Sequence, residues 1–234
     1  MNRILLFIFS LLISFQSYGQ RMAIELIVQY NKLNRVTKSC QIRASSKQSL
    51  TEFPFKNEYF AGNKKDAHCS QFISNKDPGK LGPNGLILSS LMKKYPQFTE
   101  NNPTEDMRQI CPLFNNFSKE QRLHFWVWFW GALSLDESNC GSNMTAQGVT
   151  SVAVGDFQME GPVSQRRSAG RPKPECFPAG SMIDFKNNAT CAVAIMDQQF
   201  RNKKKLFGVV TYWQKLRRSS GSVYTLLKKY PGCN

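Results

Sequence analysis

The 234-residue chain is long enough for one domain with a sizeable core, and it carries a formal net charge of +15 at pH 7. This excess of basic residues favours an anionic polymer as the partner, but charge by itself does not choose among wall polymers, lipopolysaccharide and nucleic acid. Two histidines accompany seven cysteines and no C-x-x-C motif occurs, which argues against a bound metal. We expect no cofactor.

Residues 1–19 are predicted to be a signal peptide. Arg3 provides a positive start, residues 4–13 are apolar except for one serine, and small residues precede a cleavage site ahead of Gln20. The apolar run is too short to span a bilayer, which favours cleavage over anchoring. We therefore expect an exported chain, periplasmic or secreted, without stable membrane insertion.

Residues 20–105 are predicted to form an N-terminal extension. Residues 21–34 have the spacing of a short packing helix, whereas residues 36–83 are polar, basic and irregular. We interpret the second stretch as a loop-rich region held by disulfides through Cys40 and Cys69. A helix over residues 84–95, capped by Asn84, completes the extension.

The seven cysteines predict up to three disulfides and one leftover thiol in an oxidising compartment. Their spacing does not define the connectivity. One hypothetical pair, Cys176 with Cys191, would close a short loop worth about 3 kcal/mol.

Residues 117–140 contain the most informative segment. Ser118 and Gln121 form an S-x-x-Q capping box, and the thirteen residues 123–135 are almost entirely apolar. A helix that is apolar on all sides lies inside a domain, and thirteen residues are fewer than the ~20 that cross a bilayer. The helix ends in Asp136-Glu137-Ser138. A carboxyl group at the end of an apolar helix is desolvated, which raises its pKa toward that of a general acid.

The rest of the chain is predicted to be mainly helical. Residues 153–161 form a glycine-bracketed segment with a buried-type glutamine, and residues 164–174 resemble a basic, solvated loop. Asn188 is expected to cap one helix, and residues 206–217 and 223–230 are expected to form two more. We assign residues 106–234 to one catalytic domain.

Three motifs resemble the lytic transglycosylase and goose-type lysozyme superfamily. The first is the hydrophobic helix ending in Glu137-Ser138. The second is Gly155-Asp-Phe-Gln158-Met, and the third is the helix that begins at Asn188. Their order and spacing match the family over residues 107–217. The resemblance implies a lysozyme-like fold preceded by the disulfide-stapled extension.

The resemblance also implies roles for individual residues. Glu137 would protonate the β-1,4 glycosidic oxygen between N-acetylmuramic acid and N-acetylglucosamine, and Ser138 would orient this glutamate or the sugar. The remaining predicted substrate-binding residues, from the glutamine motif and the later aromatic position, are Gly155, Phe157, Gln158, Met159 and Tyr212.

The absence of Asp and Glu from residues 139–155 favours a lytic transglycosylase, in which the muramyl 6-hydroxyl replaces water and a 1,6-anhydro end forms. Three other carboxylates keep a hydrolytic lysozyme open, because each is a candidate for positioning water: Asp136, Asp156 and Glu160. The same three acids suggest a preference for deacetylated peptidoglycan, on which some relatives in predatory bacteria act.

A non-catalytic, cationic wall-binding protein is the alternative from another class. The expected partners in either case are peptidoglycan glycan strands and anionic envelope polymers, bound by a monomer. Nucleic acid is disfavoured by the export signal and by aromatic residues that concentrate in one buried helix rather than interleaving with basic ones.

Overall fold

The computed structural model describes residues 66–74, 80–101, 103–148, 151–160, 174–177, 180–209 and 211–233. The chain divides into two compact units, residues 1–48 and 49–234, and all described residues belong to the second. The predicted signal peptide, the helix over residues 21–34, Cys40 and most of the basic loop over residues 164–174 lie outside the described residues.

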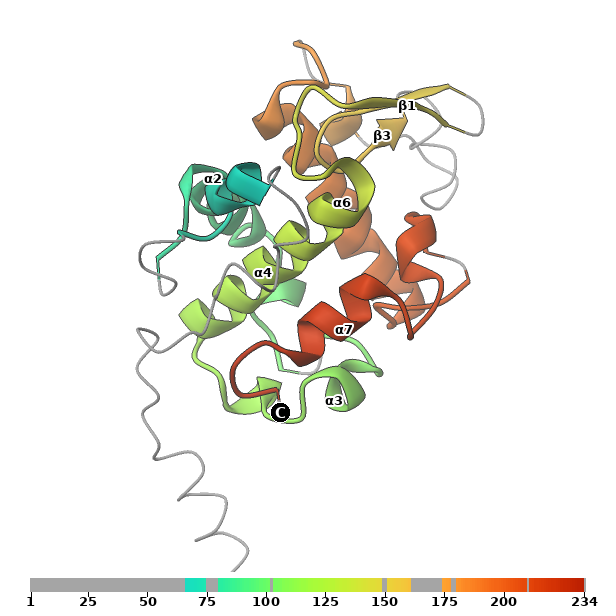
Figure 1. The fold of residues 1–234 in the computed structure, drawn as a ribbon. Coiled ribbons are helices and arrows are strands. Elements are labelled where there is room, and N and C mark those ends of the chain that lie inside the picture. The colour runs from blue at the N-terminus through green and yellow to red at the C-terminus, as the bar shows by residue number, and fades with distance from the viewer. Residues whose placement is uncertain are drawn as a thin grey trace, which may run out of the picture. The chain divides into compact units, whose positions relative to one another are not determined.

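Helix α4 (Lys119–Ser138) runs through the middle of this unit (Figure 1). Its predicted capping box is confirmed. Ser118 Oγ accepts a hydrogen bond from the Gln121 backbone N–H at 3.2 Å, and Gln121 Oε1 accepts one from the Ser118 backbone N–H at 2.7 Å. The twelve consecutive residues from 123 to 134 are buried, as the apolar sequence predicts.

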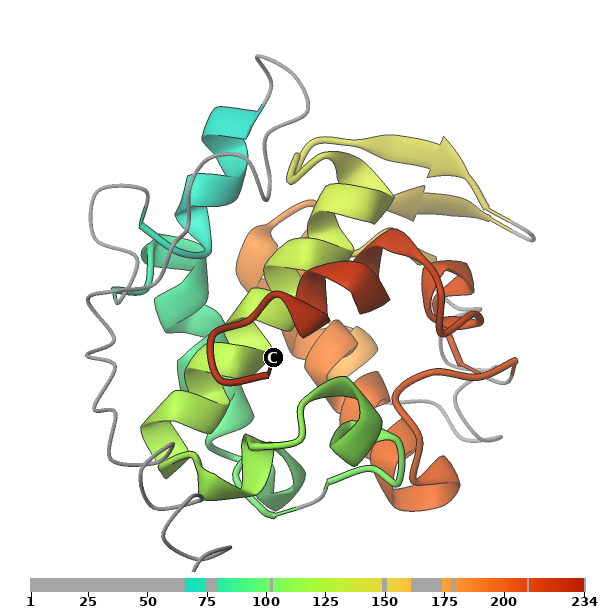
Figure 2. The ribbon, with the colours of Figure 1, turned by 60° about the horizontal axis from the view of Figure 1, so that its bottom comes forward.

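Three helices pack around α4: α2 (Pro83–Met92), α6 (Phe185–Lys203) and α7 (Ser222–Lys228). Helix α7 contacts α4 directly, and α2 contacts both α4 and α6 (Figures 1 and 2). The short α3 (Met107–Ile110) contacts α7. The described residues also form five 3-10 helices: η3 (Asp66–Gln71), η4 (Pro96–Phe98), η5 (Phe114–Asn116), η6 (Pro174–Cys176) and η7 (Gln214–Leu216).

Aromatic rings from distant segments meet along α4. Trp126 contacts Phe98 and Phe200 with ring centroids 5.5 and 5.2 Å apart, and Trp130 contacts Trp213 at 5.6 Å. Such edge-on and tilted pairs add ~0.5–1.5 kcal/mol each beyond the area they bury. The aromatic residues of α4 therefore tie η4, α6 and the segment after α6 into one core.

A small antiparallel sheet follows α4, with the strand order β1 (Thr145–Gln147), β2 (Val152–Val154) and β3 (Met159–Glu160). Register places Ala146 opposite Ala153, and Val154 opposite Met159. Strands of two or three residues are too short to produce a recognisable alternating pattern. The sequence consequently predicts a mainly helical domain, and this is confirmed. It does not predict the sheet.

Two predicted helix starts were wrong by a few residues. Helix α2 has Gly82 as its N-cap and Pro83 in its first turn, and Asn84 lies buried inside the helix. Helix α6 starts at Phe185, where the Asp184 side chain accepts the Asn187 backbone N–H at 3.0 Å. Asn188 is therefore free to take the different role described below.

In residues 206–209 and 211–217, the described part of the helix predicted over residues 206–217, only η7 is helical. The Asp106 carboxylate accepts hydrogen bonds from the backbone N–H groups of Leu206 and Phe207, at 3.0 and 2.9 Å. This contact, across about a hundred residues, holds the start of the segment in a non-helical conformation. The helix expected over residues 223–230 is present as α7.

Three disulfides staple the unit: Cys69–Cys140, Cys111–Cys233 and Cys176–Cys191. The last one confirms the predicted pair. The first links a part of the predicted extension to the end of α4. Residues 69–98 also supply buried side chains to the same core as residues 107–233, so the structure places this part of the extension within the helical domain.

Among the described residues, none of the helices has the length and apolar character needed to cross a membrane.

We expect Ser118→Ala to lower the free energy of unfolding by about 1 kcal/mol, because it removes the acceptor of the capping box. Urea denaturation of the oxidised protein measures the change. The exposed Ser220→Ala is the matched control and should stay within ~0.5 kcal/mol of the parent. Equal stability of both variants would show that the box does not define the start of α4.

Candidate active site

Glu137 lies in the last turn of α4, partly buried where the helix meets the small sheet. Burial raises the pKa of the Glu137 carboxyl to about 7; the positive charge of Lys215 opposes this shift and the negative charge of Asp136 adds to it. The carboxyl therefore exchanges its proton near neutral pH, which is the property a general acid needs.

The adjacent carboxylate has a different environment. Asp136 accepts a hydrogen bond from the Ser222 hydroxyl and lies 3.6 Å from Lys215 Nζ. Two neighbouring acids thus differ in their contacts: Asp136 is paired with α7 and the segment before it, whereas Glu137 is desolvated. Because Asp136 is already paired, it is poorly suited to position water. This is one of the roles that the sequence left open for it.

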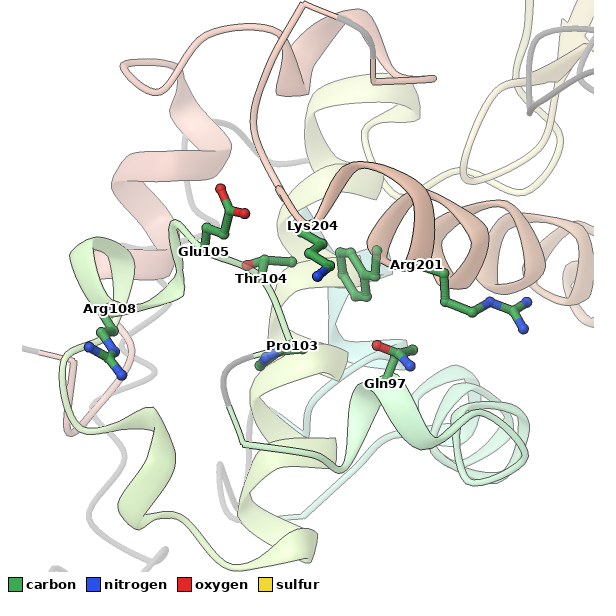
Figure 3. A pocket seen from close by; sticks show the side chains of 8 residues that line it. Gln97, Pro103, Thr104, Glu105, Arg108, Arg201 and Lys204 are labelled. Carbon is green, nitrogen blue, oxygen red and sulfur yellow. The ribbon is translucent and has the colours of Figure 1, made fainter.

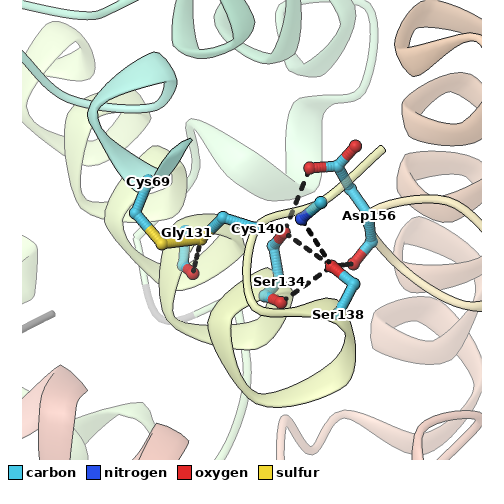
Figure 4. The surroundings of a disulfide bond; sticks show 7 residues. Cys69, Gly131, Ser134, Ser138, Cys140 and Asp156 are labelled. Carbon is cyan, nitrogen blue, oxygen red and sulfur yellow. Dashed lines mark hydrogen bonds between the residues drawn. A yellow bond between two sulfur atoms is a disulfide. The ribbon is translucent and has the colours of Figure 1, made fainter. Parts of the chain in front are cut away.

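The end of α4 has an unusual backbone. Asn139 and Cys140 both adopt left-handed conformations, with φ of 53° and 57°, where one glycine is the usual choice. The Cys140 N–H donates to Ser134 O at 3.1 Å, and the Cys69–Cys140 disulfide fixes the same residue from the other side (Figure 4). The covalent bond and the hydrogen bond hold the chain that follows Glu137.

Ser138 joins the helix end to the turn between β2 and β3. Its Oγ lies 2.9 Å from Asp156 O and 3.0 Å from Ser134 O, and it accepts the Gly141 N–H at 3.3 Å (Figure 4). The side chain is buried, so it orients the backbone next to Glu137 rather than contacting a sugar. This corrects its predicted contact with substrate.

Asp156 is also buried, with Oδ1 accepting a hydrogen bond from the Ser134 hydroxyl at 3.2 Å. A carboxylate at 0% exposure has no access to a polysaccharide or to attacking water. Its role is to hold the turn against α4, which corrects the hypothesis that it positions water.

Gly155 and Gln158 shape the same turn. Gly155 has φ of 77°, and a Cβ at this position would come 2.5 Å from Asn188 Nδ2, so only glycine fits. Gln158 Nε2 donates to Gly155 O at 2.9 Å and to Met144 O at 3.2 Å. Both predicted residues thus support the backbone of the turn.

Asn188 is the residue that connects this turn to α6. Its Oδ1 accepts the Phe157 N–H at 3.0 Å, and its Nδ2 donates to Val154 O and Met182 O at 2.9 and 3.0 Å. The side chain is completely buried. A helix-capping interpretation missed this bridge because its partners in the turn, Val154 and Phe157, are more than thirty residues away.

Phe157 and Met159 were predicted to line the cleft, and this was wrong. Both side chains have 0% exposure. Phe157 packs against Trp130 at 4.9 Å and Phe185 at 6.0 Å between ring centroids. The left-handed residues on either side of it turn its ring toward the core.

Tyr212 is partly exposed and lies beside β3. Its hydroxyl accepts the Glu160 backbone N–H at 3.1 Å, and its ring packs against Trp213 at 4.9 Å. The segment that carries Tyr212 continues into η7, where Lys215 reaches the acids of α4. Sequence reasoning missed Lys215, because nothing near it in the chain indicates its partner.

A cavity of about 590 Å³ lies elsewhere, at the C-terminal end of α6 (Figure 3). Its lining residues are Gln97, Pro103, Thr104, Glu105, Arg108, Phe200, Arg201 and Lys204. None of them belongs to the predicted site, and Asn188 lies near the opposite end of α6. In the described part of the chain, no three His, Cys, Asp or Glu side chains are grouped closely enough to hold a metal ion.

The described structure is thus a mainly helical domain that is stapled by disulfides. Its candidate site is a desolvated carboxyl group, Glu137, beside a small sheet. Its fold is similar to that of Bd0314 DslA from Bdellovibrio in its wild-type form 2, with a TM-score of 0.54 and 17% identity. The match covers 65% of this chain and 91% of that one. Two glutamate-to-glutamine variants of DslA match with TM-scores of 0.51 and the same coverage, at 16% and 17% identity.

No known protein family matches the sequence, and no curated protein matches it either. At this level of identity the similarity to DslA establishes the fold alone.

We expect Asn188→Ala to destabilise the protein by about 3 kcal/mol, because it leaves two carbonyls and one N–H buried without partners. Asn187→Ala is the matched control; its side chain bonds only near the surface, so it should cost less than ~1 kcal/mol. Chemical denaturation measures both. Similar losses for the two variants would contradict the bridging role.

Proposed function

We propose that this chain is an exported, peptidoglycan-cleaving glycosidase of lysozyme-like fold with Glu137 as its general acid. The observation that carries the proposal is the desolvated carboxyl at the end of a buried helix, with a pKa of about 7. The three motifs that resemble the lytic transglycosylase and goose-type lysozyme superfamily support the substrate, the β-1,4 bond between N-acetylmuramic acid and N-acetylglucosamine. The three disulfides support an oxidising compartment.

In the first step, neutral Glu137 gives its proton to the glycosidic oxygen while the bond from C1 to that oxygen breaks. General acid catalysis of this kind contributes ~10²–10⁴-fold. The developing positive charge at C1 is then met either by the muramyl 6-hydroxyl, giving a 1,6-anhydro end, or by water, giving a reducing end. The same protonation serves a lytic transglycosylase and a lysozyme.

A non-catalytic wall-binding protein is the second candidate, supported by the net charge of +15. Both candidates would bind glycan strands and anionic envelope polymers as a monomer. Only the glycosidase requires Glu137, so one substitution separates the two.

Preference for deacetylated peptidoglycan is a narrower proposal. It requires acids that face the ammonium groups of the substrate. Asp156 is buried and Asp136 is paired with Lys215, so the preference depends on Glu160, which is partly exposed. Parallel digestion of acetylated and deacetylated walls tests it, and equal rates would contradict it.

We expect activity to fall above pH 7 by about tenfold per pH unit, because only the neutral form of Glu137 donates a proton. Lys215→Met should move this fall to higher pH, because Lys215 lowers the pKa of Glu137. The rate of wall-suspension clearing between pH 5 and 9 measures both effects. Lys205→Met, an exposed control, should leave the profile unchanged; an identical shift there would assign the effect to net charge.

Glu137→Gln should abolish release of soluble muropeptides, with a loss of at least ~10²-fold. Glu120→Gln, in the first turn of the same helix, is the control and should keep full activity. Mass spectrometry of the soluble products from purified peptidoglycan gives the readout. If the Glu137→Gln protein retained the parent's effect on cells, the wall-binding alternative would replace the enzyme.

A further inference from the structure

The cavity at the C-terminal end of α6 is separate from the candidate active site. The turn that contacts Ser138 is bonded to α6 through Asn188, whereas the cavity includes Lys204, just beyond the end of the same helix. These two positions are sixteen residues apart (204 − 188), which corresponds to about 24 Å along a helix. A small ligand in the cavity is therefore too far away to contact that turn.

Backbone and core contacts define the walls of the cavity. The Glu105 backbone N–H donates to Lys204 O at 2.7 Å, and Asp106 holds the residues that follow Lys204. Phe200 is 1% exposed, and its ring centroid lies 5.2 Å from that of Trp126. The volume of about 590 Å³ is within the range of ~300–1,000 Å³ that is typical of small-molecule sites.

Two of the cations that line the cavity are available to a ligand. Lys204 ends α6 in a left-handed conformation, with φ of 50°, where glycine or asparagine is usual. Among the described residues, no acid forms an ion pair with the side chain of Lys204 or of Arg108. The third cation, Arg201, is paired with Asp197 (Figure 3).

The charge of the lining favours a ligand with a single negative charge. Lys204 and Arg108 contribute two positive charges and Glu105 one negative charge, so the balance is +1 (2 − 1). One carboxylate neutralises this balance. A phosphate, which carries a charge of about −1.5 to −2 at pH 7, would exceed it and would be repelled by Glu105.

Thr104 is independent evidence for a ligand. Its side chain lines the cavity and is 2% exposed, and its hydroxyl has no hydrogen-bond partner among the described residues. Buried hydroxyl groups nearly always have a partner, so an exception of this kind needs an explanation. A carboxylate bound in the cavity provides one, because it accepts hydrogen bonds from hydroxyl groups.

The remaining lining residues suit a short peptide. Pro103 and Phe200 provide apolar surface, and Gln97 presents a half-buried amide that can both donate to and accept from a peptide group.

We propose that this cavity is a second, non-catalytic binding site, which takes the free carboxylate end of a short peptide. Lys204 and Arg108 hold the carboxylate, and Thr104 donates a hydrogen bond to it. Peptidoglycan strands carry short peptides with free carboxylates, so the site would keep the protein on the wall between cleavage events. The identity of the peptide as part of the wall rests on the proposed function, whereas the carboxylate chemistry does not.

Calorimetric titration with alanyl-alanine and with its C-terminal amide tests the site. The wild-type protein should bind the dipeptide with a Kd of ~1 mM and the amide at least ~10-fold more weakly, because the charge-assisted bonds are lost. Lys204→Met should weaken dipeptide binding at least ~10-fold. Lys203→Met is the matched control: it removes an exposed charge one residue earlier, outside the cavity lining, and should change the Kd by less than ~2-fold.

Thr104→Val separates ligand binding from stability. It removes the hydroxyl and keeps the shape of the side chain, so it should weaken dipeptide binding about three- to tenfold without lowering the thermal stability of the free protein. Equal affinities for the dipeptide and its amide, equal losses from Lys203→Met and Lys204→Met, or no saturable binding below ~10 mM would overturn the site. Tighter binding of inorganic phosphate than of the dipeptide would overturn the assignment to a carboxylate.

Co-sedimentation with purified walls tests the source of the peptide. Lys204→Met should reduce binding to intact peptidoglycan at least ~3-fold and leave binding to glycan strands without peptides unchanged. Equal losses on both materials would overturn the wall peptide as the ligand. Dipeptide binding should be unchanged in Glu137→Gln, so activity that survives this substitution would overturn the proposed function and leave the cavity site standing.

Discussion

Incomplete solvation of one carboxyl group is the constraint on which the site depends. Helix α4 is buried along twelve consecutive residues, so its last turn emerges among apolar neighbours rather than into bulk water. Glu137 lies in that turn, and burial raises its pKa to about 7. The tryptophans and phenylalanines of α4 are buried in the core and so fix the position of the helix whose last turn carries this carboxyl.

Holding the sheet against this helix end requires polar links, because the small sheet has little core of its own. The Cys69–Cys140 disulfide, the contact of Ser138 with Asp156 and the Asn188 bridge supply them. The two hydrogen-bonded links use buried polar groups that are satisfied in the folded protein and would be costly if left without partners. These contacts fix the end of α4, the turn after β2 and the start of α6 relative to one another.

Features set by residues close together in the chain were predicted correctly, whereas side-chain orientations set by tertiary packing were not. The capping box, the buried helix and the position of Glu137 were predicted because their signals are local: a capping motif, an unbroken apolar run and the acids that end it. Phe157 and Met159 were misassigned because an apolar residue in a turn has the same sequence signature whether it faces a cleft or the core. The orientation was decided by positive φ at Gly155 and Gln158 and by packing against Trp130.

The sequence by itself determined the central helix, its caps and the acid at its end, since side chains within one turn of a helix impose those features on one another. Tertiary structure alone decided the surroundings of each acid. Asp156 was enclosed by Ser134 and Ser138, Asp136 was paired with Lys215, and Glu160 was brought over Gly148. Such contacts join residues far apart in the chain, and no local pattern records them.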